Sequence, residues 1–181
     1  MGARHFCLFE TPIGACAIAW SADAILGVLL PQDDPGQTPV RMQQRFPGAA
    51  TAVVPEWVQG VIDRVQQLLA GRCQDALADV PLDMAGVPAF NQRVYQVART
   101  ILPGQTLTYG EVAARIGDPG AARAVGQALG HNPFAPIVPC HRVLAAGKRS
   151  GGFSAGGGVA TKLKMLEIEK AQLGDGRGLF D

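Results

Sequence analysis

The chain changes character near residue 87, and this change constrains its fold more than any other feature. Residues 5–30 contain two β-rich runs around a Thr-Pro-Ile-Gly turn and a third run, AILGVLL, which ends before Pro31. The segment PEWVQGVIDRVQQLLAG begins with Pro55, ends with Gly71 and carries apolar residues at helical spacing, which predicts a core helix. The segment ALADVPLDM reads as a further strand. We therefore expect an α/β domain over residues 1–87.

The second half is expected to be mainly helical, forming a domain over residues 88–181. PAFNQRVYQVARTI predicts a helix that Pro103-Gly104 ends. Thr108 is a suitable N-cap for the next helix, and Glu111 three positions later completes a capping box. PGAARAVGQALG follows after a short turn, so the two helices resemble a helix-turn-helix unit. Many such helix pairs bind nothing, and the pattern alone does not establish a nucleic-acid partner.

Charge and side-chain size add to this pattern. Residues 88–154 carry seven Lys/Arg against two Asp/Glu, whereas residues 1–87 carry five against nine. The helix with Ala122 and Gly126 has small side chains and a single charged one, Arg123. Tight packing against neighbouring helices and close approach to nucleic acid both account for a thin helix, and the charge excess of the middle segment is small enough to arise by chance. We favour a nucleic-acid surface because this helix lies in the most basic third of the chain.

The cysteines and the apolar runs predict a cellular setting. Four cysteines are scattered without paired spacing, so we expect free thiols in a reducing, cytoplasmic compartment. No apolar run reaches the ~18 residues that a membrane span needs, and we recognise no signal peptide. His5, Cys7 and Cys16 do not form a complete metal-ligand set, so no metal site is expected.

The candidate chemistry centres on PIVPCHRV, residues 136–143, where Cys140 is followed directly by His141. If this segment is extended, as Pro139 favours, the two side chains point to opposite faces and His141 can assist Cys140 only through a water or a bend. Taken alone, a single cysteine is more often inert than reactive. The glycine-rich stretch GKRSGGFSAGGG, residues 147–158, is too flexible for a core, and we interpret it as the wall of a pocket that faces Cys140.

A helix is predicted for VATKLKMLEIEK, residues 159–170, and it supplies a candidate partner for His141. Glu167 falls at helical spacing with Val159, Leu163 and Leu166, so we expect it to face inward. A buried carboxylate needs a partner, and His141 is the natural one, since the carboxylate would orient the ring and raise its basicity. A surface position paired with a lysine is an equally good interpretation of Glu167.

RAVGQALGHNPFAPIVPCHRV, residues 123–143, followed by a glycine-rich loop and a Glu-bearing helix, resembles the O6-alkylguanine-DNA alkyltransferases. The similarity covers about residues 88–170, and in the first half only the strand pattern and the TPIG turn are similar. It implies a ribonuclease-H-like sheet in the α/β N-terminal domain and a winged-helix-like C-terminal domain with the helix-turn-helix. It also implies a monomer that acts on double-stranded DNA, needs no cofactor and does not bind membranes.

The resemblance further implies a role for each site residue. Cys140 would accept the alkyl group of O6-alkylguanine irreversibly, with O4-methylthymine as a second candidate lesion, while His141 through a water and Glu167 would remove the thiol proton. Tyr109 would donate a hydrogen bond to the guanine, and Asn132 would bridge the helix to the Cys140 segment. The substrate-binding residues would be Val143, through its carbonyl, Ser154, through its N–H, and Phe153. The DNA-binding residues would be Arg123, which fills the gap of the flipped nucleotide, Tyr109, Ala122 and Gly126.

The chain departs from the family pattern at several positions, and two other functional classes compete with repair. Phe153 stands where the family commonly has Tyr, and Gly130-His131 stand where an arginine is expected nearby. The zinc site of some members is not expected, because Cys16 does not fall at the matching place. A non-catalytic DNA-binding or damage-sensing module is the main alternative, although Cys140 argues against it. A thiol hydrolase is the third class, weakened because hydrolases place base and nucleophile apart in sequence.

Overall fold

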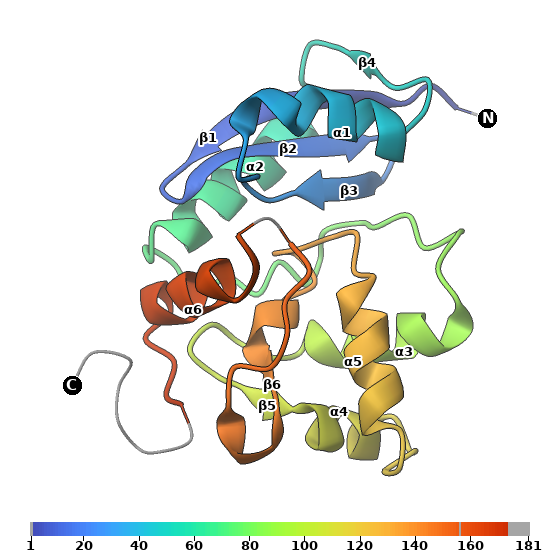
Figure 1. Ribbon diagram of the computed structural model, residues 1–181. Coiled ribbons are helices and arrows are strands. Elements are labelled where there is room, and N and C mark those ends of the chain that lie inside the picture. The colour runs from blue at the N-terminus through green and yellow to red at the C-terminus, as the bar shows by residue number, and fades with distance from the viewer. Residues whose placement is uncertain (1, 156, 174–181) are drawn as a thin grey trace.

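The structure is a computed structural model that describes residues 2–155 and 157–173 (Figure 1). The first half contains a four-stranded sheet of order β3-β2-β1-β4. β1 (His5–Thr11), β2 (Gly14–Trp20) and β3 (Ile25–Leu29) form an antiparallel meander, and β4 (Ala50–Thr51) pairs with β1 in parallel. The three predicted strands and the TPIG turn are therefore confirmed.

Helices cover both faces of this sheet because successive side chains of β2 point to opposite sides. Cys16, Ile18 and Trp20 pack in the large core with α2 (Glu56–Leu69), the helix that the Pro55–Gly71 pattern predicts. Ala17 and Ala19 pack instead with Met42 and Phe46 of the segment around α1 (Thr38–Arg45), which follows a single turn, η1 (Pro35–Gln37). The sequence analysis predicted no helix in this segment, and only Thr38 and Met42 of α1 are buried.

The segment ALADVPLDM is not a strand, contrary to the sequence prediction. It forms only an isolated bridge between Leu82 and Ile25, in which Ile25 donates its N–H to Pro81 and accepts one from Asp83. Pro81 has no N–H to continue a ladder, which limits the pairing to this point. The segment instead joins the two halves of the molecule.

The second half is mainly helical, as predicted, with α3 (Ala89–Ala98), α4 (Tyr109–Arg115) and α5 (Ala122–Gly130) packed together. The predicted capping box is present, because the Thr108 hydroxyl accepts from the Glu111 N–H while the Glu111 carboxylate accepts from the Thr108 N–H. α6 (Gly158–Ile168) lies apart from this group, on the side toward α2 (Figure 1). Gly156 and residues 174–181, which belong to the predicted loop and domain, lie outside the described residues.

A very short parallel pair of strands organises the second half. β5 (Leu107–Thr108) pairs with β6 (Val143–Leu144), with Leu107 opposite Val143. β5 leads directly into Tyr109, and β6 directly follows η2 (Cys140–Arg142); a further short turn, η3 (Ala146–Lys148), comes next. The pairing therefore brings Tyr109 and Cys140 to the same place from positions 31 residues apart in the chain.

The two halves share one hydrophobic core. The main buried cluster contains Ile18 and Val65 from the first half and Val94, Val112 and Met165 from the second. The edge of β3 also bonds to the second half directly, because Val28 donates its N–H to the Pro133 carbonyl at 2.9 Å. This edge contact fixes the sheet beside the segment that carries Asn132 and Cys140. Within the described residues, no helix is both long and apolar enough to cross a bilayer.

Tyr95→Phe should lower the free energy of unfolding by about 1 kcal/mol, since a buried hydrogen bond is lost without changing the ring. The Tyr95 hydroxyl donates to the Ala128 carbonyl at 2.7 Å and so joins α3 to the last turn of α5. Urea denaturation measures the change. Thr100→Ala, which removes an exposed hydroxyl just after the same helix, is the control and should change the stability by less than about 0.5 kcal/mol. Equal effects of the two substitutions would contradict this role of Tyr95.

Candidate active site

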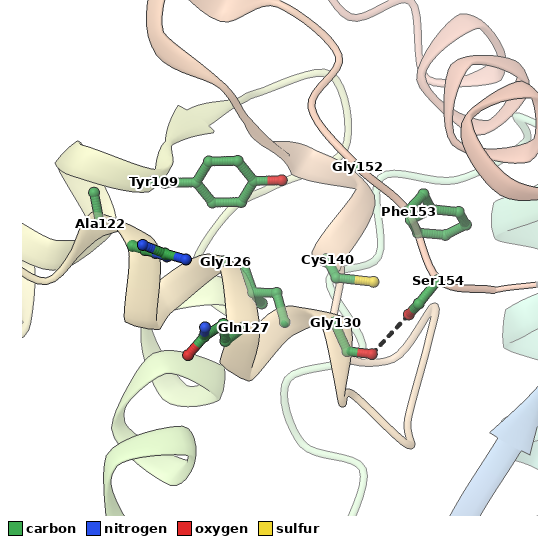
Figure 2. A pocket seen from close by; sticks show the side chains of 11 residues that line it. Tyr109, Ala122, Gly126, Gln127, Gly130, Cys140, Gly152, Phe153 and Ser154 are labelled. Atoms are coloured by element: carbon green, nitrogen blue, oxygen red, sulfur yellow. Dashed lines mark hydrogen bonds between the residues drawn. The ribbon is translucent and has the colours of Figure 1, made fainter.

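Cys140 lies at the inner end of a pocket of about 540 Å³ that α5, Tyr109 and the glycine-rich loop enclose (Figure 2). The thiol residue is 8% exposed. Ala122, Arg123, Gly126 and Gly130 line the pocket from α5, while Gly152, Phe153 and Ser154 line it from the loop. The interpretation of the loop as the wall of a pocket facing Cys140 is therefore confirmed.

The backbone at Cys140 is a tight turn and not the extended segment that we expected. Cys140–Arg142 form a 3-10 turn in which the Arg142 N–H donates to the Pro139 carbonyl at 2.9 Å. The turn begins at Pro139, whose φ of −82° and ψ of 67° are not extended. The expectation failed because Pro139 favours an extended backbone only at the residue before it, Val138. The conformation of Cys140–Arg142 depends instead on the β5–β6 pairing and on the burial of their side chains.

His141 is fully buried and hydrogen-bonded to a carboxylate, but the carboxylate is Glu169. The two side chains meet at 2.8 Å between Nε2 and Oε1, and Arg142 donates to both oxygens of the same carboxylate, at 2.9 Å and 2.7 Å. Burial acts to raise the pKa of Glu169, but the interactions with His141 and Arg142 outweigh it and lower the pKa to about 2. Glu169 is therefore an anion at neutral pH.

Glu167 was the wrong glutamate, because it is exposed and bonds neither His141 nor Arg142. The buried positions of this helix are Lys162, Met165 and Leu166, and Glu169 continues the same spacing just past its end. Our sequence analysis chose the neighbouring face because it grouped Glu167 with Val159, Leu163 and Leu166 and did not consider Lys162. Val159, which we assigned to the inner face, is in fact 38% exposed.

The anionic Glu169 determines which nitrogen of His141 carries hydrogen. Nε2 must donate to the carboxylate, so in the neutral ring Nδ1 is the free acceptor. Nδ1 is buried and has no hydrogen-bond partner among the described residues. Burial lowers the pKa of His141, although Glu169 acts in the opposite direction, and the ring is therefore neutral at rest.

Two residues lower the pKa of the Cys140 thiol and so oppose the effect of its burial. Burial raises its pKa, while a hydrogen bond with Asn132 and the positive charge of Lys162 lower it. Asn132 is held in place because its Nδ2 donates to the Val138 carbonyl at 2.8 Å and its Oδ1 accepts from the Phe134 N–H at 2.9 Å. The predicted bridge from α5 to the Cys140 segment is thus present.

Lys162 is the functional candidate that the sequence analysis missed. Its side chain is fully buried, and Nζ donates to the carbonyls of Val143 at 2.8 Å and Gly152 at 3.2 Å. Burial lowers its pKa to about 8. Lys162 therefore joins the glycine-rich loop to the segment after Cys140, and the spacing of Lys162 with Met165, Leu166 and Glu169 is the signal that would have revealed it.

Tyr109 and the loop contact each other closely. The Tyr109 hydroxyl points toward the side of the pocket that holds Cys140 and Gly152 (Figure 2). Burial raises the pKa of Tyr109, so the hydroxyl keeps its hydrogen at neutral pH. A Cβ at Gly151 would lie 2.7 Å from the hydroxyl oxygen, and the φ of Gly151 is +67°, so glycine is needed here on both counts.

At the mouth of the pocket, Arg123 is exposed on α5. It forms no ion pair or side-chain hydrogen bond with any other residue in the described ranges. Across from α5, the Ser154 hydroxyl donates to the Gly130 carbonyl at 2.7 Å, the dashed bond in Figure 2. Phe153 packs partly buried against the main core, beside the pocket. Seven of the predicted site residues therefore line the pocket: Tyr109, Ala122, Arg123, Gly126, Cys140, Phe153 and Ser154. His141 and Val143 follow Cys140 in the chain and Asn132 hydrogen-bonds its thiol, whereas Glu167 lies apart.

Comparison with known proteins supplies the family. Residues 89–171 match the family model described as 6-O-methylguanine DNA methyltransferase, DNA binding domain. The methylated-DNA–protein-cysteine methyltransferase of Mycobacterium tuberculosis is 36% identical over 179 residues, which cover 98% of this chain and 99% of the relative. The chain belongs to the methylated-DNA–protein-cysteine methyltransferase family. The Ada protein of Escherichia coli, named a bifunctional transcriptional activator and DNA repair enzyme, is 36% identical over 168 residues, which cover 92% of this chain and 46% of Ada.

Solved structures of methyltransferases also match this chain over both halves. A crystal structure of M. tuberculosis OGT in complex with DNA matches with a TM-score of 0.75 and 37% identity, covering 92% of each chain. The O6-methylguanine-DNA methyltransferase of Pyrococcus kodakaraensis matches with a TM-score of 0.68 and 26% identity, covering 92% of this chain and 98% of that one. The α/β first half therefore belongs to the shared fold, although our sequence analysis recognised there only the strand pattern and the TPIG turn.

Glu169→Gln should lower the free energy of unfolding by about 3 kcal/mol, because it leaves the buried Arg142 cation without its counter-charge. Glu167→Gln is the matched control, two positions away on the same segment, and should change stability by less than about 0.5 kcal/mol because its side chain is exposed. Urea unfolding at neutral pH compares the two variants. A larger loss for Glu167→Gln would restore the original assignment and overturn the one made from the structure.

Proposed function

We propose that this chain repairs DNA by moving the alkyl group of O6-alkylguanine onto Cys140, once per protein molecule. The observation that carries the proposal is the position of Cys140 in a pocket, next to a buried His141–Glu169 pair. A cysteine needs its thiolate form to attack a carbon, and such a pair provides an oriented base. Membership of the methyltransferase family supports the same activity.

The proton of the thiol is removed by a relay in this proposal. A water accepts the Sγ proton of Cys140 and passes one to Nδ1 of His141, the ring atom that is buried without a protein partner in the described chain. The imidazolium that forms is stabilised by the Glu169 carboxylate on its other nitrogen. This arrangement needs no direct contact between the adjacent Cys140 and His141 side chains.

The transfer itself is a displacement at the alkyl carbon. The thiolate of Cys140 forms a bond to this carbon as the carbon–O6 bond breaks, and the guanine regains a proton in exchange. Tyr109, which keeps its hydroxyl hydrogen, and the N–H of Ser154 stabilise the leaving base by donating hydrogen bonds. The carbonyls of Cys140 and Val143 accept from the exocyclic amine of guanine. The second of these carbonyls is held by Lys162 and has a second lone pair for the base.

The base must leave the duplex to reach Cys140, because O6 of guanine is otherwise inside the base stack. We propose that α5 approaches the minor groove through Ala122 and Gly126 while Arg123 fills the space of the flipped nucleotide. Its exposure at the pocket mouth and its lack of an ion pair in the described residues support this role. Contacts with phosphates should make the binding strongly dependent on salt concentration.

The finer features of the architecture and setting belong to the same proposal. We infer a ribonuclease-H-like N-terminal domain and a winged-helix-like C-terminal domain that meet near residue 87, supported by the β3-β2-β1-β4 order and by the α4–α5 pair. One molecule acts alone, since acceptor, base and DNA-facing helix come from one chain. A cytoplasmic location suits a thiol that must stay reduced.

The two competing functions lose support on physical grounds. A module that only binds damage has no use for a buried thiol beside an oriented base. A thiol hydrolase would need water to regenerate the enzyme, whereas a thioether at Cys140 has no leaving group that water displaces easily. The expected product is therefore a permanently alkylated protein.

Incubation with a duplex that contains O6-methylguanine should add one methyl group to the protein, located on Cys140 by mass spectrometry of peptides. The yield should approach one methyl per molecule and then stop. Cys73→Ser keeps Cys140 and should react fully, whereas Cys140→Ser should not. Binding without a mass change would support the damage-binding alternative, and turnover of an ester or peptide would support a hydrolase.

Arg123→Ala should slow repair of duplex DNA by about ten-fold or more, in line with the few kcal/mol that unstacking a base costs. The reaction with free O6-methylguanine base should remain near normal, because a free base needs no flipping. Single-turnover rates with the two substrates measure the difference. An equal loss on duplex and free base would contradict the role assigned to Arg123.

A further inference from the structure

A second cavity, of about 310 Å³, reaches Cys140 from the side of the N-terminal domain. It shares Gly130, Cys140 and Ser154 with the acceptor pocket described above. Its other described lining residues come from β3 and the segment after it, from α1, from the stretch after α5 and, as Ala155, from the glycine-rich loop. The acceptor thiol thus lies between two cavities.

A hydrogen bond joins two of the three residues that both cavities share. The Ser154 hydroxyl donates to the Gly130 carbonyl at 2.7 Å, and both residues are exposed. Breaking a single exposed hydrogen bond costs only about 1 kcal/mol, because water replaces either partner. A substituent on the reacting carbon can therefore pass between Ser154 and Gly130 into the second cavity.

The second cavity is positively charged. Arg41 and Arg45 line it together with His131, and none of its described lining residues is acidic. These are two of the five basic residues in the first 87 positions, a region that carries nine acidic ones. Two cations of an otherwise acidic region therefore line a cavity that the acceptor cysteine also lines.

Unlike Arg142, which is buried and bonded to Glu169, neither Arg41 nor Arg45 forms an ion pair among the described residues. Arg41 is exposed and makes no ion pair or side-chain hydrogen bond within the described parts of the chain. Arg45 donates one long hydrogen bond, 3.3 Å to the Val28 carbonyl, and stacks 5.5 Å from the centre of the Phe46 ring. Burial lowers the pKa of Arg45, and no carboxylate opposes that effect. Both guanidinium groups retain donors for an anion.

We propose that this cavity receives an anionic substituent carried on O6 of guanine, such as the carboxylate of O6-carboxymethylguanine, with Arg41 and Arg45 as its binding groups. The inference rests on the proposed transfer to Cys140 and extends it to a substrate class. Arginine binds carboxylates through two parallel hydrogen bonds, a geometry that lysine does not offer. The cavity volume easily holds a group of a few heavy atoms.

The chemistry balances in the same way as for a methyl group. Sγ of Cys140 attacks the CH₂ carbon, the carbon–O6 bond breaks, and the guanine regains the proton that the thiol gave up. The product is S-carboxymethylated Cys140, whose carboxylate stays beside the arginines. A DNA phosphate is a less suitable occupant, because phosphates remain on the strand outside the pocket mouth, whereas the O6 substituent points toward Sγ.

The test compares three adducts in one duplex sequence: O6-methylguanine, O6-carboxymethylguanine and the uncharged O6-carbamoylmethylguanine, which matches the second in size. For Arg41→Gln we expect a roughly ten-fold slower single-turnover rate on the carboxymethyl adduct, the loss of about 1.4 kcal/mol of charge-assisted binding. The rates on the other two adducts should stay within about two-fold, since the predicted loss depends on the carboxylate charge. Arg45→Gln should act in the same direction.

Arg72→Gln, an exposed arginine of the same half outside this cavity, is the matched control and should leave all three rates unchanged. Equal losses on all three adducts would overturn the proposal in favour of a contact with the DNA phosphates. Unchanged rates on the carboxymethyl adduct in both variants would also overturn it. Failure of the unmodified protein on O6-methylguanine would instead contradict the proposed function, so the two failures are distinguishable.

Discussion

The buried carboxylate of Glu169 is the interaction on which the rest of the site depends. Its side chain is 5% exposed and binds both His141 and Arg142, whose side chains are 0% and 1% exposed. Removing these charges from water is costly, and only close pairing with further hydrogen bonds offsets the cost. Arg142 provides such a bond to the Ile101 carbonyl at 2.7 Å, so one charge cluster joins the end of α6, the Cys140 turn and the segment after α3.

A single face of α6 supports the acceptor from two directions. Lys162 and Glu169 are seven positions apart, two helical turns, and therefore lie on the same side of the helix. Lys162 holds the loop that forms one wall of the pocket, while Glu169 holds the base. The helix itself lies away from α5, the helix that lines the pocket mouth with Arg123 (Figure 1). α6 thus supports the acceptor, whereas α5 faces the substrate. A substitution on the DNA-facing surface of α5 therefore leaves the cluster of Glu169, His141 and Arg142 intact.

Much of the fold followed from local sequence signals, and the exceptions share a cause. The β-meander, the α2 stripe and the Thr108 capping box are local patterns, and all three are confirmed. α1 was missed because it is short and mostly polar, with only Thr38 and Met42 buried. The β5–β6 pair has two residues in each strand and depends on contacts 36 positions apart. Local propensity cannot reveal such a pairing, because tertiary contacts decide it.

The site shows the same limit at the level of single residues. Cys140, Asn132, Tyr109 and Ser154 were identified from a motif. In the structure Cys140, Tyr109 and Ser154 line one pocket, and Asn132 forms a hydrogen bond with the Cys140 thiol. The glutamate was wrong because choosing the buried face of α6 requires accepting a buried lysine, which is rare without paired acceptors. The acceptors are the carbonyls of Val143 and Gly152, which no sequence pattern marks. Polar residues at a functional site break the rule that charged side chains face solvent, so helical periodicity misleads there first.

The directions of the pKa shifts indicate the protonation states of the acceptor cysteine and its base before the reaction. Burial raises the pKa of Cys140 and lowers the pKa of His141, so the pair is neutral and not a thiolate–imidazolium ion pair. A protonated thiol is a poor nucleophile and resists oxidation, which matters for a cysteine that reacts only once. The charge separation then has to occur during the reaction. Glu169 stabilises the new imidazolium and Lys162 the new thiolate, so each charge that develops already has a fixed, buried counter-charge next to it.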